Sequence, residues 1–267
     1  MIRLGIIGAA GRMGRRIAAL AIESQQFDIV CGTELPGHDA LGQDIGRLAG
    51  VGDFGVAVGE KLTGQPQVVI DFSLPEGTMQ HLPACRNAGV AMVIGTTGLT
   101  ASQEAEIADT ASMLPIVRAG NFSMGINVLL NAVRTVARAL GGEYDIEISE
   151  THHRFKKDAP SGTALMLGRA AAEGRNVQLP DVARYGREGH CPRQPGEIGI
   201  SALRLGDTVG EHSVHFGSLG ETVTLSHSAH TRDIFVRGAL RAAGWLPGRQ
   251  PGLYDMQDVL GLKEPRS

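Results

Sequence analysis

The segment Gly8-Ala-Ala-Gly-Arg-Met-Gly14 decides the fold class of this chain. It follows an apolar run, Ile2–Ile7, that is typical of a buried strand, and it leads into Arg15–Ser24, where apolar residues recur at helical spacing. The glycines permit a tight turn, and the small side chains allow a pyrophosphate to approach the backbone at the start of the helix. The segment therefore predicts a dinucleotide-binding βαβ unit.

An acidic residue supports this interpretation. The next expected strand, Phe27–Gly32, leads to Glu34. Dinucleotide-binding units place a carboxylate about 20 residues after the glycines, where it accepts hydrogen bonds from ribose hydroxyls. Any tight strand-to-helix turn can contain three glycines, so the glycines alone are weak evidence. The combination of strand, turn, helix, strand and terminal acid favours dinucleotide binding.

Further strands continue the same alternation with helices. The apolar runs Val68–Phe72, Val90–Ile94 and Ile116–Arg118 predict buried strands, and an α/β fold with a Rossmann-type parallel sheet follows from them. Turn-forming residues follow each strand, and ligands of such sheets bind at the carboxyl ends of the strands. The alternative is that these are ordinary turns. The three segments are Asp71-Phe-Ser73, Gly95-Thr-Thr-Gly98 and Ala119-Gly-Asn-Phe122.

The pattern changes after Ser123. A long helix is expected over Met124–Leu140, and apolar and polar residues then alternate from Tyr144 to Ser149, as in a half-exposed strand. We therefore expect a second, smaller α/β domain with an open mixed sheet over 124–232. Residues 1–123 and 233–267 are expected to form the dinucleotide-binding domain. The segment 35–64 reads as loop-rich.

Composition restricts the classes of partner. The chain has 267 residues, of which 42% are hydrophobic and 20% charged, a balance typical of globular proteins. The net charge of −3 indicates no nucleic-acid partner. The three cysteines lie far apart, which argues against a disulfide framework and fits a cytoplasmic protein. No apolar run reaches the ~18 residues of a membrane span, and no signal peptide is expected.

A second motif, Glu150-Thr-His-His-Arg-Phe-Lys-Lys-Asp-Ala-Pro-Ser-Gly-Thr163, follows the alternating strand. We expect a helix to begin near its end, with Pro160 in the first turn and Ser161 or Asp158 as the cap. The N–H groups of such a helix start would bind a carboxylate, and nearby histidines and lysines can move protons near neutral pH. The alternative is a solvated basic loop before an ordinary capped helix.

Other readings of polar residues are disfavoured. The two H-x-x-H sequences, His212–His215 and His227–His230, lie on expected strands, where residues three apart face opposite sides, so a shared metal ion is not expected. Ser161 lacks the setting of a nucleophile, since it occupies an expected cap position. Trp245 and Tyr254 are interpreted as packing residues.

The chain closely resembles the dihydrodipicolinate (4-hydroxy-tetrahydrodipicolinate) reductase family over essentially its full length. The most specific match is His152-His-Arg-Phe-Lys156 with Asp158-Ala-Pro-Ser-Gly-Thr163. Three further matches accompany the glycine turn: Val93-Ile-Gly-Thr-Thr-Gly98, Asn121-Phe-Ser123 and Gly210-Glu-His212.

The resemblance implies a reductase of lysine and diaminopimelate synthesis that converts 4-hydroxy-tetrahydrodipicolinate to tetrahydrodipicolinate. It implies that His152 and Lys156 transfer protons, and that His153, Gly162 and Thr163 bind the substrate. The second domain would bind this small cyclic dicarboxylate and build a homotetramer. Contacts to NADH or NADPH are implied for Gly8, Ala9, Ala10, Gly11, Arg12, Met13, Glu34, Gly95, Thr96, Thr97, Ala119, Gly120, Asn121 and Phe122.

Two positions depart from the family's dual-cofactor members. Leu35 and Leu74 stand where those members carry arginines that would pair with a 2′-phosphate, so we expect a preference toward NADH, although Arg12 and Arg16 remain nearby. Two competing functions remain: another nicotinamide-dependent reductase of small carbonyl or imine acids, and a non-catalytic nicotinamide sensor. The motif from His152 to Thr163 argues against both.

Overall fold

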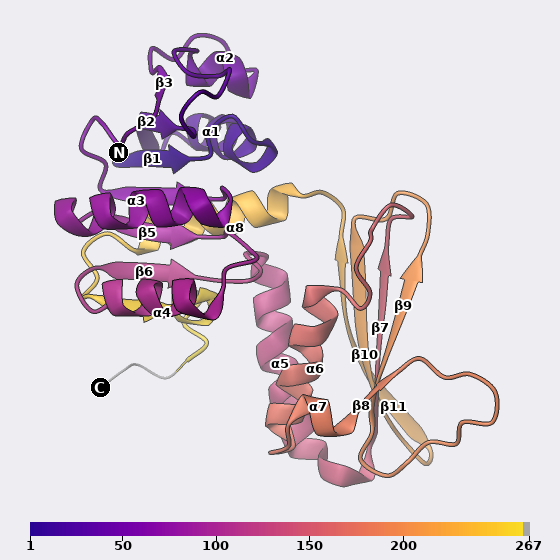
Figure 1. The fold of residues 1–267 in the computed structure, drawn as a ribbon. Helices are drawn as coiled ribbons and strands as arrows, with labels where there is room; N and C mark the ends of the chain where they lie inside the picture. The colour runs from indigo at the N-terminus through magenta and orange to yellow at the C-terminus, as the bar shows by residue number, and fades with distance from the viewer. Residues whose placement is uncertain (264–267) are drawn as a thin grey trace. The chain divides into compact units, whose positions relative to one another are not determined.

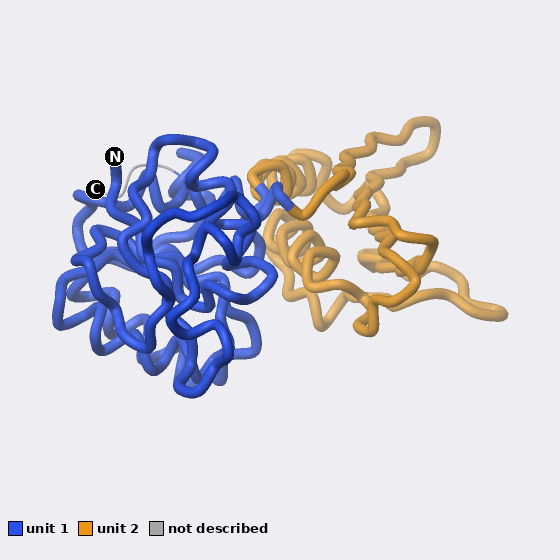
Figure 2. The backbone as a smooth tube through the Cα atoms, turned by 90° about the horizontal axis from the view of Figure 1, so that it is seen from above, with its two compact units in different colours: residues 1–123, 233–267 blue, residues 124–232 orange. Residues whose placement is uncertain are grey.

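The chain divides into two units in the computed structural model, which describes residues 1–263. Unit 1 begins at Met1, ends at Ser123 and resumes at Asp233, whereas unit 2 comprises Met124–Arg232. Figure 2 shows the two units in different colours. The chain therefore leaves unit 1 and returns to it.

Unit 1 is built on a seven-stranded sheet with the order β12-β6-β5-β4-β1-β2-β3. All pairings in this sheet are parallel, which confirms the predicted fold class. The last strand in sequence pairs with β6 at one edge (Figure 1). The strands are β1 (Ile2–Ile7), β2 (Phe27–Thr33), β3 (Val58–Gly59), β4 (Val68–Asp71), β5 (Ala91–Ile94), β6 (Pro115–Arg118) and β12 (Gly252–Tyr254).

Helices cover both faces of this sheet. Alternate residues of one strand enter different cores: Val68 and Ile70 of β4 pack with α1 and α8, whereas Val69 packs with α3 and α4. Burial on both faces explains why these strands read as continuous apolar runs. The helices are α1 (Arg12–Ser24), α2 (Ile45–Ala49), α3 (Pro75–Ala88), α4 (Ala101–Thr110), α8 (Asp233–Trp245) and α9 (Met256–Val259).

Some predicted element boundaries are wrong for identifiable reasons. Helix α1 begins at Arg12 rather than Arg15, because Gly11 is already its N-cap. The sequence pattern predicts the next helix over Thr78–Asn87, whereas α3 already begins at Pro75, a residue that suits a first helical position. The segment read as loop-rich contains α2 and β3, and the Asp44 carboxylate caps α2 by accepting hydrogen bonds from the N–H groups of Gly46 and Arg47. Aspartate is a preferred N-cap residue, so Asp44 was a sequence signal for the start of this helix.

Unit 2 contains a mixed five-stranded sheet with the order β11-β10-β7-β9-β8. The strands β7, β8 and β9 run parallel, whereas β10 runs antiparallel to both neighbours. The helices α5 and α6 cover one face, where Ile148, Ile200 and Val214 are buried against them (Figure 1). The elements are α5 (Met124–Leu140), η1 (Gly141–Glu143), β7 (Asp145–His152), α6 (Gly162–Gly174), α7 (Leu179–Val182), β8 (Ala183–Tyr185), β9 (Ile198–Arg204), β10 (Gly210–Ser218) and β11 (Glu221–Ala229). Neither α7 nor β8 was predicted.

Candidate active site

The carboxyl ends of the parallel strands bring the proposed cofactor residues to one edge of the unit 1 sheet. In the sheet the strands that carry these residues lie in the order β6, β5, β4, β1 and β2, which differs from their order in the chain. Such an edge is where open α/β sheets bind ligands. In this order the proposed cofactor residues are Ala119–Phe122, Gly95–Thr97, Gly8–Met13 and Glu34. Ser73 and Leu74, which follow β4 and were not proposed as contacts, lie between the second and third of these segments.

The glycine turn has the geometry that a pyrophosphate requires. Gly8 has a φ of +75°, and a Cβ at Gly14 would lie 2.1 Å from the Gly8 carbonyl oxygen. Helix α1 therefore lies directly against the turn, and its start is accessible, since Gly11 and Arg12 are exposed. The Ala10 N–H donates to the Glu34 carboxylate over 2.7 Å. These residues fit a dinucleotide with its pyrophosphate at the helix start and its ribose near Glu34.

Two proposed cofactor residues also hold the edge together. The Thr96 hydroxyl lies 3.3 Å from the buried Asp71 carboxylate and accepts a hydrogen bond from Thr78 over 2.8 Å. The Asn121 side-chain oxygen accepts a hydrogen bond from the Ser123 N–H over 2.8 Å. Thr96 and Asn121 are buried, whereas Thr97 and Gly120 are exposed at the same edge. The exposed residues are the better candidates for direct contact with a cofactor.

The second motif forms one compact group at an end of unit 2. His152 is the last residue of β7, and Gly162 is the first residue of α6. Ser161 is the N-cap of α6, and its hydroxyl accepts a hydrogen bond from the Ala164 N–H over 3.2 Å. Pro160 therefore precedes the cap, and its predicted place in the first helical turn is wrong. The N–H groups of Gly162 and Thr163 lie in the first turn of this helix, which is where helices bind anions.

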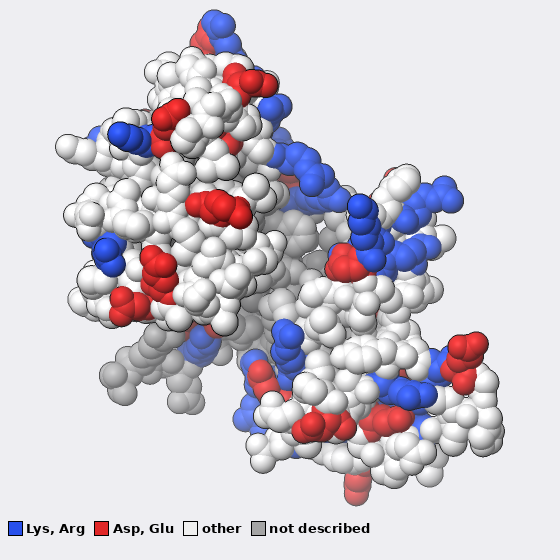
Figure 3. Space-filling model, in the orientation of Figure 1, with Lys and Arg blue, Asp and Glu red and all other residues white. Residues whose placement is uncertain are grey.

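Basic side chains surround this helix start. Lys156 lies in the connection between β7 and α6, and its Nζ is 2.8 Å from the Asp158 carboxylate. His153 Nε2 is 3.5 Å from an Arg232 guanidinium nitrogen. Figure 3 shows Lys and Arg side chains gathered over the end of this unit where β7 ends and α6 begins. This charge suits a dianionic ligand, and no sequence signal had pointed to Arg232.

A buried carboxylate organises the group. The Glu150 side chain is fully buried and accepts hydrogen bonds from His152 Nδ1, from both terminal nitrogens of Arg204 and from the Ser161 N–H. Burial alone would raise the pKa of Glu150, but the hydrogen bonds from Arg204, His152 and Ser161 hold it below its usual value. The carboxylate is therefore ionised. Glu150 had been included in the sequence motif without a role, and Arg204, which reaches the site because β9 pairs with β7, had been missed.

His212 completes the surroundings of His152. Its ring packs edge-on against the His152 ring, with 5.1 Å between centroids, and its Nε2 is 3.3 Å from the Ser161 hydroxyl. Burial and the neighbouring His152 lower the pKa of His212 to about 4, so this ring is neutral at neutral pH. No role had been predicted for His212 from the sequence, although it lies in one of the segments that match the family. The structure places it beside His152, and the described residues 1–263 contain no group of three potential metal ligands.

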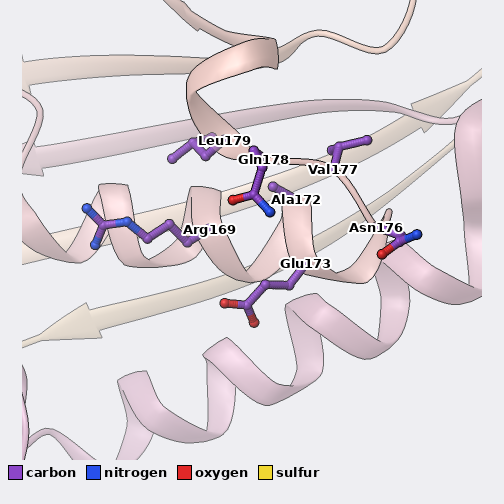
Figure 4. Close-up of a pocket in the computed structure, with 7 residues that line it drawn as sticks. All are labelled: Arg169, Ala172, Glu173, Asn176, Val177, Gln178 and Leu179. Atoms are coloured by element: carbon purple, nitrogen blue, oxygen red, sulfur yellow. The ribbon is translucent and has the colours of Figure 1, made fainter.

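A separate hollow lies at the opposite end of α6 (Figure 4). Its charged residues are partly engaged elsewhere, since Glu173 pairs with Arg134 over 2.8 Å. No histidine, cysteine or second carboxylate accompanies Glu173 there. The hollow therefore lacks the groups for proton transfer. It is lined by Arg169, Ala172, Glu173, Asn176, Val177, Gln178 and Leu179.

The fold and the two groups of residues define an α/β oxidoreductase that uses a pyridine nucleotide. Models of the N-terminal and C-terminal parts of dihydrodipicolinate reductase match residues 2–122 and 125–260. The chain belongs to this family. It is 51% identical to the 4-hydroxy-tetrahydrodipicolinate reductase of Rubrobacter xylanophilus, covering 97% of this chain and 98% of the relative. It is 47% identical to that of Acinetobacter baumannii, covering 98% and 97%.

Solved structures agree with this assignment. The dipicolinate-bound dihydrodipicolinate reductase of Paenisporosarcina sp. TG-14 superposes with a TM-score of 0.77 at 25% identity, covering 97% of this chain and 98% of that one. An amine dehydrogenase of Mycobacterium smegmatis superposes with a TM-score of 0.60 at 14% identity, covering 94% of each chain. This second likeness shows a shared fold alone.

Proposed function

We propose that this chain reduces 4-hydroxy-tetrahydrodipicolinate to tetrahydrodipicolinate in lysine and diaminopimelate biosynthesis, with His152 and Lys156 transferring protons. The observation that carries the residue roles is the arrangement at the end of β7, where an oriented histidine lies next to a capped helix start. The N–H groups at Gly162 and Thr163, with the Thr163 hydroxyl, would bind one carboxylate. His153, next to Arg232, would bind the other.

The bound nicotinamide supplies a hydride to the conjugated imine ring of the substrate. The residues of unit 2 supply the remaining chemistry. Loss of the 4-hydroxyl as water takes up one proton on its oxygen, for which His152 is the candidate donor, and releases one proton from the adjacent ring carbon. After hydride addition the ring takes up one proton from a positioned acid, for which Lys156 is the candidate. The basic surroundings would hold the dianion in place.

The activity is tested directly by following oxidation of the reduced nucleotide with substrate generated from pyruvate and aspartate semialdehyde. A reductase of this family consumes the nucleotide only when both precursors and their condensing enzyme are present. A nicotinamide-binding sensor would show no turnover. A reductase of other carbonyl or imine acids would prefer simple oxo acids offered in the same assay.

Thr163 tests the proposed carboxylate site. Thr163→Val removes a hydroxyl donor while it preserves shape, so substrate binding should weaken by about 1–3 kcal/mol. Binding of the nucleotide should be unchanged, because its proposed site lies in unit 1. Substrate KM and nucleotide affinity are the measurements, and Thr222→Val on β11 is the matched control. Equal losses for both ligands would contradict the assignment.

The finer cofactor preference is also a proposal: NADH should serve at least as well as NADPH. Glu34 would accept hydrogen bonds from ribose hydroxyls and repel a 2′-phosphate. Two nearby arginines are engaged, because Arg16 forms a two-pronged pair with Asp233 at 2.7 and 2.5 Å, and the Arg15 side chain donates to the Ala10 carbonyl over 2.6 Å. Arg16 therefore makes a poor substitute for the missing arginines, whereas Arg12 is exposed.

Steady-state kinetics with both nucleotides test this preference. A tenfold or greater preference for NADPH in kcat/KM, about 1.4 kcal/mol, would refute it. If the preference holds, the variant Leu35→Arg should raise kcat/KM with NADPH about tenfold, since a guanidinium beside the ribose pairs with the 2′-phosphate. The matched control is Met113→Arg, which introduces the same charge at an exposed apolar residue elsewhere in unit 1.

We also propose that the chain forms a homotetramer through its unit 2 sheets and works in the cytoplasm. Within the described part of unit 2, no helix covers the sheet face opposite α5 and α6. Leu203, Leu205 and Tyr185, on or beside its strands, are each at least half exposed. Apolar exposure of this kind marks interaction surfaces. Sedimentation should show a tetramer at micromolar concentration, and a monomer would contradict the proposal. None of the helices in residues 1–263 is long and apolar enough to span a membrane.

A further inference from the structure

Glu150 contacts groups that belong to three parts of the proposed substrate site. One carboxylate oxygen accepts hydrogen bonds from the Ser161 N–H and from an Arg204 nitrogen, each over 3.0 Å. The other accepts from His152 Nδ1 and from the second Arg204 nitrogen, the latter over 3.0 Å. Arg204 also donates to the Asp158 carbonyl over 2.5 Å. The carboxylate thus joins the end of β7, the connecting loop and the start of α6.

This arrangement determines which nitrogen of His152 carries hydrogen. An ionised carboxylate only accepts hydrogen bonds, so the nitrogen that faces it must be an N–H. The two-pronged pair with Arg204 keeps Glu150 ionised. The Nδ1 atom of His152 is therefore protonated in both charge states of the ring, and Nε2 alone gains and loses a proton.

Gly210 lies beside the other nitrogen of the ring. A Cβ at Gly210 would lie 3.1 Å from His152 Nε2, so the absent side chain leaves space beside this atom. His212 flanks the ring edge-on and is uncharged at neutral pH, as described above. It therefore places no second positive charge beside His152.

We infer that Glu150 is a positioning residue for the proton transfer: clamped by Arg204, it keeps hydrogen on His152 Nδ1 and leaves Nε2 to exchange a proton with the substrate. This inference rests on the proposed role of His152. The carboxylate also anchors the Ser161 N–H, so one group aligns the proton-transfer atom with the helix start that would hold the substrate carboxylate.

Glu150→Gln separates these two tasks. The amide oxygen can still accept from the Ser161 N–H, and this orientation turns the amide NH₂ toward His152 Nδ1 and one Arg204 nitrogen. The reverse orientation would set the NH₂ against two fixed donors, the Ser161 N–H and the other Arg204 nitrogen. The Nδ1 atom must then accept a hydrogen bond, so the ring changes to the tautomer with hydrogen on Nε2. In this tautomer Nε2 cannot accept a proton, and loss of its own proton would leave an unfavourable anionic ring. The kcat should fall about 10²-fold or more, as when a histidine is held in the wrong tautomer. Substrate KM should change by less than about threefold.

The experiment is long-range ¹H–¹⁵N NMR of the full chain with labelled histidine, at a pH well above the ordinary histidine pKa of about 6.5. The His152 signals are identified by their loss in His152→Gln. We expect the Nδ1–H tautomer in the wild type and the Nε2–H tautomer in Glu150→Gln. The matched control is Glu147→Gln, also on β7, because Glu147 pairs with Arg187 over 2.9 Å and with Arg193 but does not contact His152. It should keep the wild-type tautomer and kcat.

Each outcome decides the inference. An Nε2–H tautomer in the wild type overturns it, even if Glu150→Gln does not fold. An unchanged tautomer in Glu150→Gln also overturns it, as does a kcat loss equalled by Glu147→Gln. A wild-type kcat in His152→Gln would instead refute the proposed catalytic role of His152, and the tautomer data would then show whether Glu150 still orients the ring.

Discussion

Replacement of Lys156 by either methionine or arginine should lower kcat by ~10²–10⁴, the usual contribution of general acid catalysis. Lys156 lies between His153 and the N-cap of α6, in reach of a substrate bound at Gly162 and Thr163. An ammonium group there can donate a proton, or it can simply attract the dianion. Arginine retains the positive charge but gives up protons poorly, because its pKa exceeds ~12.

The two variants therefore distinguish the roles. If Lys156 is the acid, both lose kcat, and substrate KM rises mainly in the methionine variant. If Lys156 only attracts the substrate, arginine restores most of the activity. Lys157→Met is the matched control, because it removes the neighbouring exposed charge and should leave kcat nearly unchanged. Near-normal turnover in both Lys156 variants would remove this residue from the mechanism.

Gly14→Ala should destabilise unit 1 by about 3 kcal/mol or more and should abolish tight binding of the nucleotide. The new Cβ would lie 2.1 Å from the Gly8 carbonyl oxygen and 2.7 Å from the Ala9 Cα. Both atoms belong to the backbone, so no side-chain rotation can relieve the overlap, and α1 must move away from the turn. Overpacking of this kind costs about 1–3 kcal/mol and sometimes more.

The measurements are urea unfolding and titration of NADH followed by fluorescence. Gly244→Ala is the matched control, since Gly244 lies in helix α8 and its nearest neighbour, Phe27, is 4.0 Å from the added Cβ. This control should be neutral or slightly stabilising, because alanine favours helices by about 0.5–1 kcal/mol over glycine. Wild-type stability and NADH affinity in Gly14→Ala would show that the turn is looser than the structure indicates.

Local sequence was sufficient for the fold class and for the cofactor edge. Strands buried on both faces are predominantly apolar, so β1, β4 and β5 could be predicted from apolar runs in the sequence. Parallel strands bring their carboxyl ends to one edge, and that rule predicted a shared location for the turns after β5 and β6. The short elements α2 and β3 were missed because their apolar runs are too brief for a periodic signal.

The motif from His152 to Thr163 likewise predicted a helix start capped by Ser161 or Asp158, because a cap and the residues it caps are adjacent in the chain. The structure has Ser161 as the cap. The sequence by itself also determined where glycine is required, since the spacing of Gly8 and Gly14 is a local property of the turn. These features depend on interactions between residues that lie close together in the chain.

Only the tertiary structure decided how His152 is oriented. Its partners Arg204, Gly210 and His212 come from β9 and β10, and their proximity depends on the pairing of both strands with β7. No local pattern encodes that register, because it results from burying Ile148, Ile200 and Val214 in one core. A shift by one residue would turn each of these side chains to the other face of the sheet. The requirement to bury the apolar face thus places the arginine that clamps Glu150, and through it the proposed proton-transfer atom.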